Sequence, residues 1–155
     1  MKLSTLHAVT IMNLDPHDLA RFVDAQAEIY ADALKEIQSG TKQNHWMWFI
    51  FPQYVGLGSS EMSKWYAIRD IHEAREYIRH PILGARLIEC AKAVTAHRSR
   101  TLEDVFGAVD ALKFRSSMTL FEVADPSSDA IRAALDAKCN AKRDPLTLDL
   151  LRISA

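Results

Sequence analysis

The segment "AVDALKFRSSMTLFEVA", residues 108–124, brings a carboxylate, an ammonium group and a hydroxyl into one line. In a helix, which turns by about 100° per residue, Asp110, Lys113 and Ser117 fall at the centre of one face. The flanks of this line are apolar, with Phe114 and Met118 on one side, Val109, Leu112, Leu120 and Val123 on the other, and Phe121 beside it. The opposite strip, which we expect to be exposed, carries Ala111, Arg115 and Glu122.

Two interpretations of this polar line stay open. Because charged side chains are rarely buried unless they are paired, Asp110 and Lys113 could form an ion pair, with a local hydrogen bond at Ser117. Alternatively, the three groups form the polar floor of a pocket with apolar walls, an arrangement that is typical of small-molecule sites. The second interpretation makes this helix one wall of a functional site.

A second candidate is the segment "QNHWMWFIFPQYVGLGSS", residues 43–60. His45 and Gln53 bracket its aromatic residues, and each can donate and accept hydrogen bonds. Gly56 and Gly58 permit a tight turn or a close approach of the backbone to another group. We expect His45, Gln53 and this turn to face a ligand, as in an anion or nucleotide cradle, although no specific phosphate-loop motif is present.

The aromatic residues of this long loop have a different expected role. Pro52 restricts Phe51 to an extended conformation. We expect Trp46, Phe49 and Phe51 to anchor the loop in the core, while Trp46 and Trp48 offer rings on which a ligand could stack. The loop therefore divides into anchoring residues and residues that remain free for binding.

Polar residues also occur on two other predicted apolar faces. Gln26 and Tyr30 are four residues apart in the middle of the apolar face of the segment 15–40. An unpaired buried amide is costly, so they bond to each other, to the backbone of the long loop, or to a ligand. Arg86 lies at the edge of an apolar face in "PILGARLIECAKAVTAH" and is suited either to a phosphate or carboxylate or to a surface ion pair.

The elements that must position these residues are helices. Asp15-Pro16 and Gly40 bound a first helix, whose apolar face repeats at the helical period and whose opposite face carries Arg21, Asp24, Glu28, Asp32 and Lys35. Further helix starts are predicted at Ser59 or Ser60, Asp70 with Glu73, Pro81, Thr101, Ser127 or Ser128, and Pro145. We predict a mainly α fold over residues 1–155, as a single compact domain of about six to eight helices with one long aromatic loop. Residues 1–13 would form a loosely ordered N-terminal extension.

Composition excludes several classes of protein. Hydrophobic residues make up 48% and charged residues 25% of the 155 residues, the ordinary balance of a globular protein. The net charge of −1 gives no broad field for nucleic acid or an anionic membrane, so we expect neither as a partner. Cys90 and Cys139 have no partner at metal-ligand spacing, which indicates reduced thiols and a cytoplasmic location. The start of the chain lacks the pattern of a signal peptide.

Familiar catalytic motifs are absent from the sequence. The six histidines show neither H-x-x-x-H nor H-E-x-x-H spacing, so we expect no metal, and we expect no cofactor. No serine lies in a G-x-S-x-G motif, which leaves a hydrolase of that kind unsupported. The sequence does not indicate an oligomeric state.

Six phrases together resemble an uncharacterised family, domain of unknown function 1810. They are "HWMWFIFPQ", "GLGSS", "YAI", "HPILGARL", "FGAVDALKFRSSMTLF" and "DPLTLDLL", in this order from about Leu14 to Leu151. The resemblance implies a mainly helical fold and carries no established activity. In addition, "KFRSSMTLFEVAD" resembles a Lys-Phe segment of helical enzymes that act on ADP-ribose and related N-glycosides, at too few positions to carry over any residue's role.

We therefore predict one pocket for a small polar or anionic ligand, with a nucleotide-like molecule as one candidate. The catalytic candidates are Asp110 as a base, Lys113 as a cation that meets negative charge, and His45. The predicted ligand-binding residues are Gln26, Tyr30, Trp46, Trp48, Gln53, Gly56, Gly58, Arg86 and Ser117. If the protein is an enzyme, the expected reaction is hydrolysis or transfer at an N-glycoside.

Two alternatives accompany this hypothesis. A non-enzymatic binding or interaction module would expose the Trp and Phe residues of the loop as a flat patch. In a purely structural reading, every singled-out polar residue stabilises the fold.

Overall fold

The computed structural model describes residues 14–154, so the extension expected over residues 1–13 lies outside the described range. No strand occurs in the described range, and one parallel bridge pairs Tyr54 with Ile68. The helices are α2 (Ala20–Gln26), α3 (Tyr30–Ser39), α4 (Met47–Ile50), α5 (Glu61–Trp65), α6 (Ile71–Arg79), α7 (Leu83–Thr95), α8 (Leu102–Phe106), α9 (Ala108–Ala124), α10 (Asp129–Lys138) and α11 (Pro145–Ser154). The predicted mainly helical, single-domain fold is confirmed, with more and shorter helices than expected.

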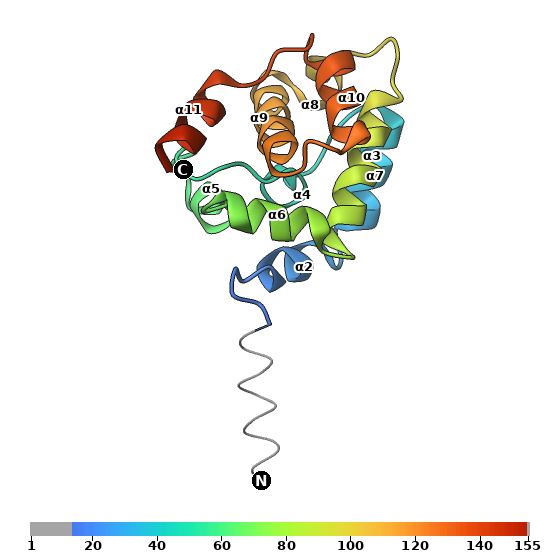
Figure 1. Ribbon diagram of the computed structural model, residues 1–155. Coiled ribbons are helices and arrows are strands. Elements are labelled where there is room, and N and C mark those ends of the chain that lie inside the picture. Colours follow the sequence, from blue (N-terminus) through green and yellow to red (C-terminus); the bar gives the residue numbers. More distant parts are fainter. Residues whose placement is uncertain (1–13, 155) are drawn as a thin grey trace, which may run out of the picture.

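Helix α9 lies at the centre of the fold, and α6, α8, α10 and α11 pack against it (Figure 1). Six consecutive residues of α9, 116–121, are buried, so this part of the helix is enclosed on all sides. The predicted exposed strip is wrong for Ala111, which is buried, whereas Val109 and Leu112 are exposed. The prediction from helical periodicity assumed that one face of this helix is buried and the other exposed. That assumption does not hold for a central helix, which has neighbours on all sides.

The predicted first helix is divided into α2 and α3 by a turn at residues 27–29. Gln26 ends α2 and Tyr30 begins α3, so the two residues do not stack one turn apart on a continuous helix. Gly40 ends α3 with a φ of 89°, a left-handed conformation that glycine adopts without strain. The predicted C-terminal boundary is therefore confirmed.

Side-chain caps begin four of the helices at predicted positions. Ser60, Asp70 and Ser128 each accept a hydrogen bond from a backbone N–H in the first turn of α5, α6 and α10. Thr101 and Asp104 form a capping box at the start of α8. These local signals fix the helix starts because each satisfies a donor that the helix itself leaves free.

Arg21 forms a buried ion pair that the sequence pattern did not reveal. Its Nη2 atom lies 2.6 Å from Oε2 of Glu73, and both side chains are almost completely buried. The guanidinium also donates to four backbone carbonyl oxygens, those of His17, Asp18, Trp65 and Ala67. The prediction that Arg21 is exposed is therefore wrong, and this residue ties α2 to α6 and to the segment before it.

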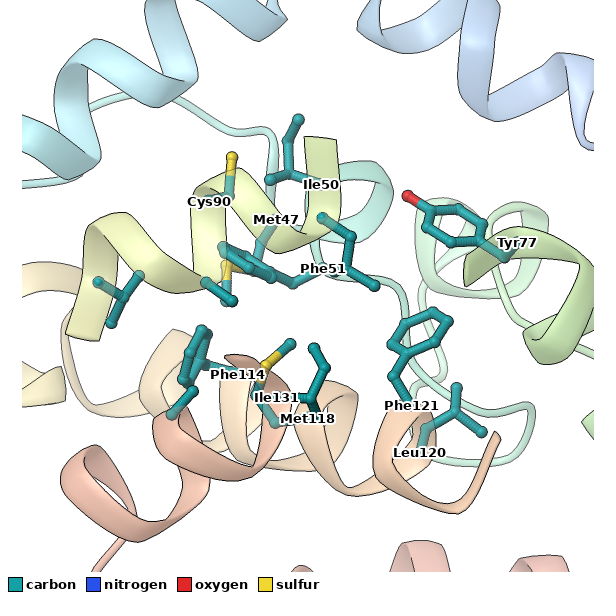
Figure 2. Packing of buried hydrophobic residues seen from close by; sticks show 14 of the residues in the cluster. Met47, Ile50, Phe51, Tyr77, Cys90, Phe114, Met118, Leu120, Phe121 and Ile131 are labelled. Atoms are coloured by element: carbon teal, nitrogen blue, oxygen red, sulfur yellow. The ribbon is translucent and has the colours of Figure 1, made fainter. Parts of the chain in front are cut away.

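The long loop enters the core through its aromatic residues. Trp46, Phe49 and Phe51 are buried, which confirms the predicted anchors. Figure 2 shows Phe51 facing Phe114 of α9, and their ring centroids are 5.0 Å apart in an edge-to-face arrangement. This packing holds the loop, including the short helix α4, against the central helix.

Candidate functional site

The first polar group of interest lies where the start of α9 meets the long loop. Asp110 Oδ2 is 2.9 Å from Lys42 Nζ, and Asp110 Oδ1 is 3.3 Å from Lys113 Nζ. The Lys113 ammonium group lies 5.3 Å from the centroid of the Trp48 ring. We call Lys42, Trp48, Asp110 and Lys113 the lysine cluster.

The lysine cluster is partly open to solvent and carries an excess of positive charge. The side-chain exposures are 8% for Lys42, 18% for Asp110 and 24% for Lys113. Two ammonium groups share one carboxylate, and each ammonium also faces an indole ring, Lys42 that of Trp46 at 5.2 Å. The arrangement can attract an anion because one carboxylate balances only one of the two cations.

Glu36 of α3 fixes the beginning of the long loop. Its carboxylate accepts hydrogen bonds from the backbone N–H groups of Gln43 and Asn44, from the Asn44 side chain and from Trp46 Nε1. Partial burial raises the pKa of Glu36, but these four hydrogen bonds outweigh it and lower the pKa from 4.5 to about 2. Glu36 therefore holds the backbone before His45 and the Trp46 side chain after it, while the His45 side chain is exposed.

The second polar group surrounds Gln26. Gln26 Nε2 donates to the Phe49 carbonyl oxygen at 2.6 Å and to the Tyr77 hydroxyl at 3.1 Å. Gln26 Oε1 accepts from Nη1 of Arg86 at 3.3 Å. Bonding to the loop backbone, one of the alternatives left open, is thus what the structure shows, and the buried amide is satisfied without a ligand.

Tyr30 lies beside the Gln26 group and contacts α7. Its hydroxyl donates to the carboxylate of Glu89, and the Arg86 guanidinium lies 4.7 Å from its ring centroid. Burial, together with the Glu89 carboxylate, raises the pKa of Tyr30, and burial raises that of Cys90 to about 12. Tyr30, Arg86 and Gln26 therefore lie together, in a group that is separate in its contacts from the lysine cluster.

The turn before α5 has structural reasons for its glycines. Gly56 has a φ of 98°, a conformation that side chains rarely permit. A Cβ atom on Gly58 would lie 2.5 Å from Cβ of Ser63, so only glycine fits against α5. Gln53 is half-buried, and its carbonyl oxygen accepts from the Ile68 N–H. These contacts account for the turn without a ligand.

Ser117 and Trp46 are less accessible than a ligand-binding role requires. Both are fully buried. The Ser117 hydroxyl has no hydrogen-bond partner within the described residues, one turn beyond Lys113 on α9. Trp48 is only half-buried, so it is the loop tryptophan whose ring can meet a ligand.

The structure thus brings Asp110, Lys113 and Trp48 together, and separately Gln26, Tyr30 and Arg86. Sequence reasoning missed Lys42 and Glu36. Lys42 lies between helices, where no periodicity indicates which way a side chain points. Glu36 lies in the last turn of α3 and is identified only by the loop that folds back onto it.

Two features of residues 14–154 bear on wider classes of function. None of the helices in this range combines the length and apolar character needed to cross a membrane. No group of three or more His, Cys, Asp and Glu side chains in this range is arranged to hold a metal ion.

Comparison with known proteins identifies the family. The fold is similar to the crystal structure of the conserved hypothetical protein Rv1873 from Mycobacterium tuberculosis, with 43% identity and a TM-score of 0.87 over 89% of this chain and 99% of that one. A search of curated proteins gave no match. Residues 16–151 match the family described as "Protein of unknown function (DUF1810)", and the chain therefore belongs to that family.

Proposed function

We propose that the protein binds a small anionic ligand at the lysine cluster. The observation that carries the proposal is that Lys42 and Lys113 share the single carboxylate of Asp110, while Asp110 and Lys113 remain partly accessible. A purely structural ion pair needs one cation, and the second ammonium group leaves positive charge uncompensated. An incoming phosphate or carboxylate would provide the missing negative charge.

The aromatic neighbour indicates a ligand with a ring. Trp48 is half-buried beside Lys113, so an anion held by the ammonium group would lie against the indole. Indole rings stack on planar groups, and the exposed His45 in the same loop supplies further hydrogen-bonding capacity. A nucleotide or an ADP-ribose derivative combines the phosphate and the planar ring that these residues favour.

If the ligand is an N-glycoside, the proposed role of Asp110 is to stabilise the positive charge that forms on the sugar during cleavage. Each of its oxygens contacts one ammonium group, so the carboxylate is held between Lys42 and Lys113. A ligand phosphate that draws Lys113 away would release Oδ1 toward the sugar. The carboxylate could then stabilise the positive charge that develops on the ring when a glycosidic bond breaks.

The alternative of an interaction module that uses the aromatic loop lacks the surface it requires. Trp46, Phe49 and Phe51 are buried, and no Trp or Phe of the loop is among the exposed large hydrophobic residues. The exposed Trp65 lies in α5, beyond the loop. We therefore favour ligand binding over a flat aromatic interface.

The test is a thermal-shift screen with AMP, ADP-ribose and ribose 5-phosphate, since a ligand of the folded state raises the unfolding midpoint. We expect at least one of these compounds to raise the Tm of the wild type by several degrees at millimolar concentration. Lys113→Gln should lose most of this shift. A matched control is Lys35→Gln, because Lys35 is an exposed lysine of α3.

The outcomes separate binding from structure. If none of the three compounds stabilises the wild type, or if Lys113→Gln and Lys35→Gln respond like the wild type, the lysine cluster is not the binding site. A hit would then be assayed for release of the base or of nicotinamide from the matching N-glycoside, with Asp110→Asn as the variant that should lose turnover.

A further inference from the structure

A small basic pocket lies on a different part of the molecule, where the ends of α7 and α10 meet α8 and α9. Its volume is about 220 Å³. The lining includes four cationic side chains and one carboxylate: Arg98, Arg100, Arg115, Lys138 and Glu103. The pocket therefore carries a surplus of three positive charges within a small volume that is partly open to solvent.

Two of the four cations are engaged in holding the backbone. Lys138 donates to the carbonyl oxygens of His97 and Arg100, and so fixes the loop that follows α7. Arg100 Nε donates to the Gly40 carbonyl oxygen at 2.8 Å. These contacts involve neutral oxygens, so they orient the two side chains without neutralising their charge.

The other two cations have no carboxylate partner. Neither Arg98 nor Arg115 forms an ion pair anywhere in residues 14–154. Arg115 Nε is buried and has no hydrogen-bond partner there. Its guanidinium lies beside the Cys139 thiol, which is a weak acceptor and carries no compensating charge. A buried donor without a partner is costly, so the Arg115 side chain, which lines the pocket, keeps unused hydrogen-bonding capacity.

The size and charge of the pocket select the ligand. Drug-sized ligands and cofactors occupy about 300–1,000 Å³, so a pocket of 220 Å³ fits a small anion or one phosphate group, not a whole nucleotide. Guanidinium groups bind phosphate oxygens in pairs of parallel hydrogen bonds, and two arginines without a carboxylate partner line this pocket. An oxyanion with several acceptor oxygens would satisfy both.

We propose that this pocket binds a phosphate group, with Arg115 as the buried donor and Arg98 as the exposed one. This site is independent of the lysine cluster, which shares none of its lining residues. Two sources offer the same chemistry, free inorganic phosphate and the terminal phosphate of a larger molecule such as ribose 5-phosphate. A free ion leaves the mouth of the pocket open, whereas the larger molecule would extend past Arg98.

The experiment compares unfolding of the full chain in sodium phosphate and in sodium chloride at equal ionic strength. We expect 10 mM phosphate to raise the Tm by about 3 °C beyond chloride, as for a site with a Kd near 1 mM. Arg115→Gln and the exposed Arg98→Gln should each weaken phosphate binding at least tenfold. Arg79→Gln, at an exposed arginine of α6, is the control and should respond like the wild type.

Isothermal titration with inorganic phosphate and with ribose 5-phosphate distinguishes the two sources. Tighter binding of ribose 5-phosphate, lost in Arg98→Gln, would identify the larger molecule. The proposal is overturned if phosphate has no effect beyond that of chloride, or if its effect persists in both Arg98→Gln and Arg115→Gln. It is also overturned if Lys113→Gln, and not these variants, abolishes the effect, because binding then belongs to the lysine cluster.

Discussion

The Arg21–Glu73 pair and the lysine cluster differ in how completely their positive charges are balanced by carboxylates. Arg21 and Glu73 form a buried pair with one cation and one anion, and the remaining guanidinium donors all reach backbone oxygens. In the lysine cluster, two cations share Asp110, and one of them, Lys113, stays partly accessible. The first cluster has no capacity left for a ligand, whereas the second retains charge and access.

The contrast separates structural polar groups from candidate binding groups by a physical criterion. A buried ion pair must be complete, because removing either partner leaves an uncompensated charge in the core. A partly exposed cluster tolerates imbalance, since water screens the excess charge until an anion arrives. The Gln26 group, whose amide is satisfied on both sides, belongs with Arg21 and Glu73.

The largest expected effect is on stability at the buried pair. Arg21→Met leaves Glu73 without its partner and should lower the free energy of unfolding by about 3–5 kcal/mol, measured by urea denaturation. The double variant Arg21→Met/Glu73→Leu should recover much of that loss. Arg79→Gln, which removes the exposed Arg79–Glu76 pair, should cost less than about 0.5 kcal/mol. Equal effects at the two arginines would contradict the distinction.

Gln26 tests whether its group is structural. Gln26→Leu leaves the Phe49 carbonyl oxygen and the Tyr77 hydroxyl without this partner, and should destabilise the fold by about 1–3 kcal/mol. Binding of the compound found for the lysine cluster should be unchanged when measured below the unfolding transition. If Gln26→Leu keeps its stability but no longer binds the ligand, Gln26 is a ligand-binding residue and not a structural one.

The hydrogen bonds between the Glu36 carboxylate and the long loop should make stability depend on pH. The pKa of Glu36 is lowered to about 2 in the folded state, from 4.5 in the unfolded chain. Its contribution to the free energy of unfolding is therefore complete above pH 4.5 and is lost as the pH falls toward 2. Because the carboxylate is partly exposed, we expect about 1 kcal/mol at neutral pH. Urea denaturation of wild type and Glu36→Gln should differ at pH 7 and converge near pH 2. A constant difference between pH 7 and pH 2 would exclude this carboxylate as the cause.

Only a small stability effect is expected at the lysine cluster itself. Lys113→Gln removes one of two cations from a partly exposed carboxylate, and Lys42 remains, so the loss should stay below about 1 kcal/mol. Ligand affinity, measured by isothermal titration with the best compound of the screen, should fall at least tenfold. A large loss of stability with unchanged affinity would make Lys113 a structural residue.

The four capped helix starts and the aromatic anchors could be predicted from the sequence because their causes are local. A cap such as Thr101 acts on its own first turn, and Phe51 is restricted by the Pro52 that follows it. The interruption of the first helix and the enclosure of α9 depend on partners far along the chain. A helical wheel assumes one solvent-facing side, and so it misplaced Ala111 and Leu112.

The candidate site was predictable in part for the same reason. Asp110 and Lys113 are three residues apart on one helix, and their pairing follows from that spacing. Lys42 reaches Asp110 only through the tertiary fold, so the excess positive charge became visible only in three dimensions. The sequence also merged Gln26, Tyr30 and Arg86 with this site, because a pattern of inward polar residues does not say which ones contact each other.

The most direct test of the account follows the three tryptophan indole N–H signals by ¹H–¹⁵N NMR during titration with ADP-ribose, AMP or ribose 5-phosphate. Trp48 should shift on binding, while Trp46, buried and bonded to Glu36, and Trp65, exposed in α5, should stay in place. The Trp48 shift should disappear in Lys113→Gln. An unmoved Trp48 signal at millimolar concentrations of all three compounds, or an equal shift in Lys113→Gln, would contradict anion binding at the lysine cluster.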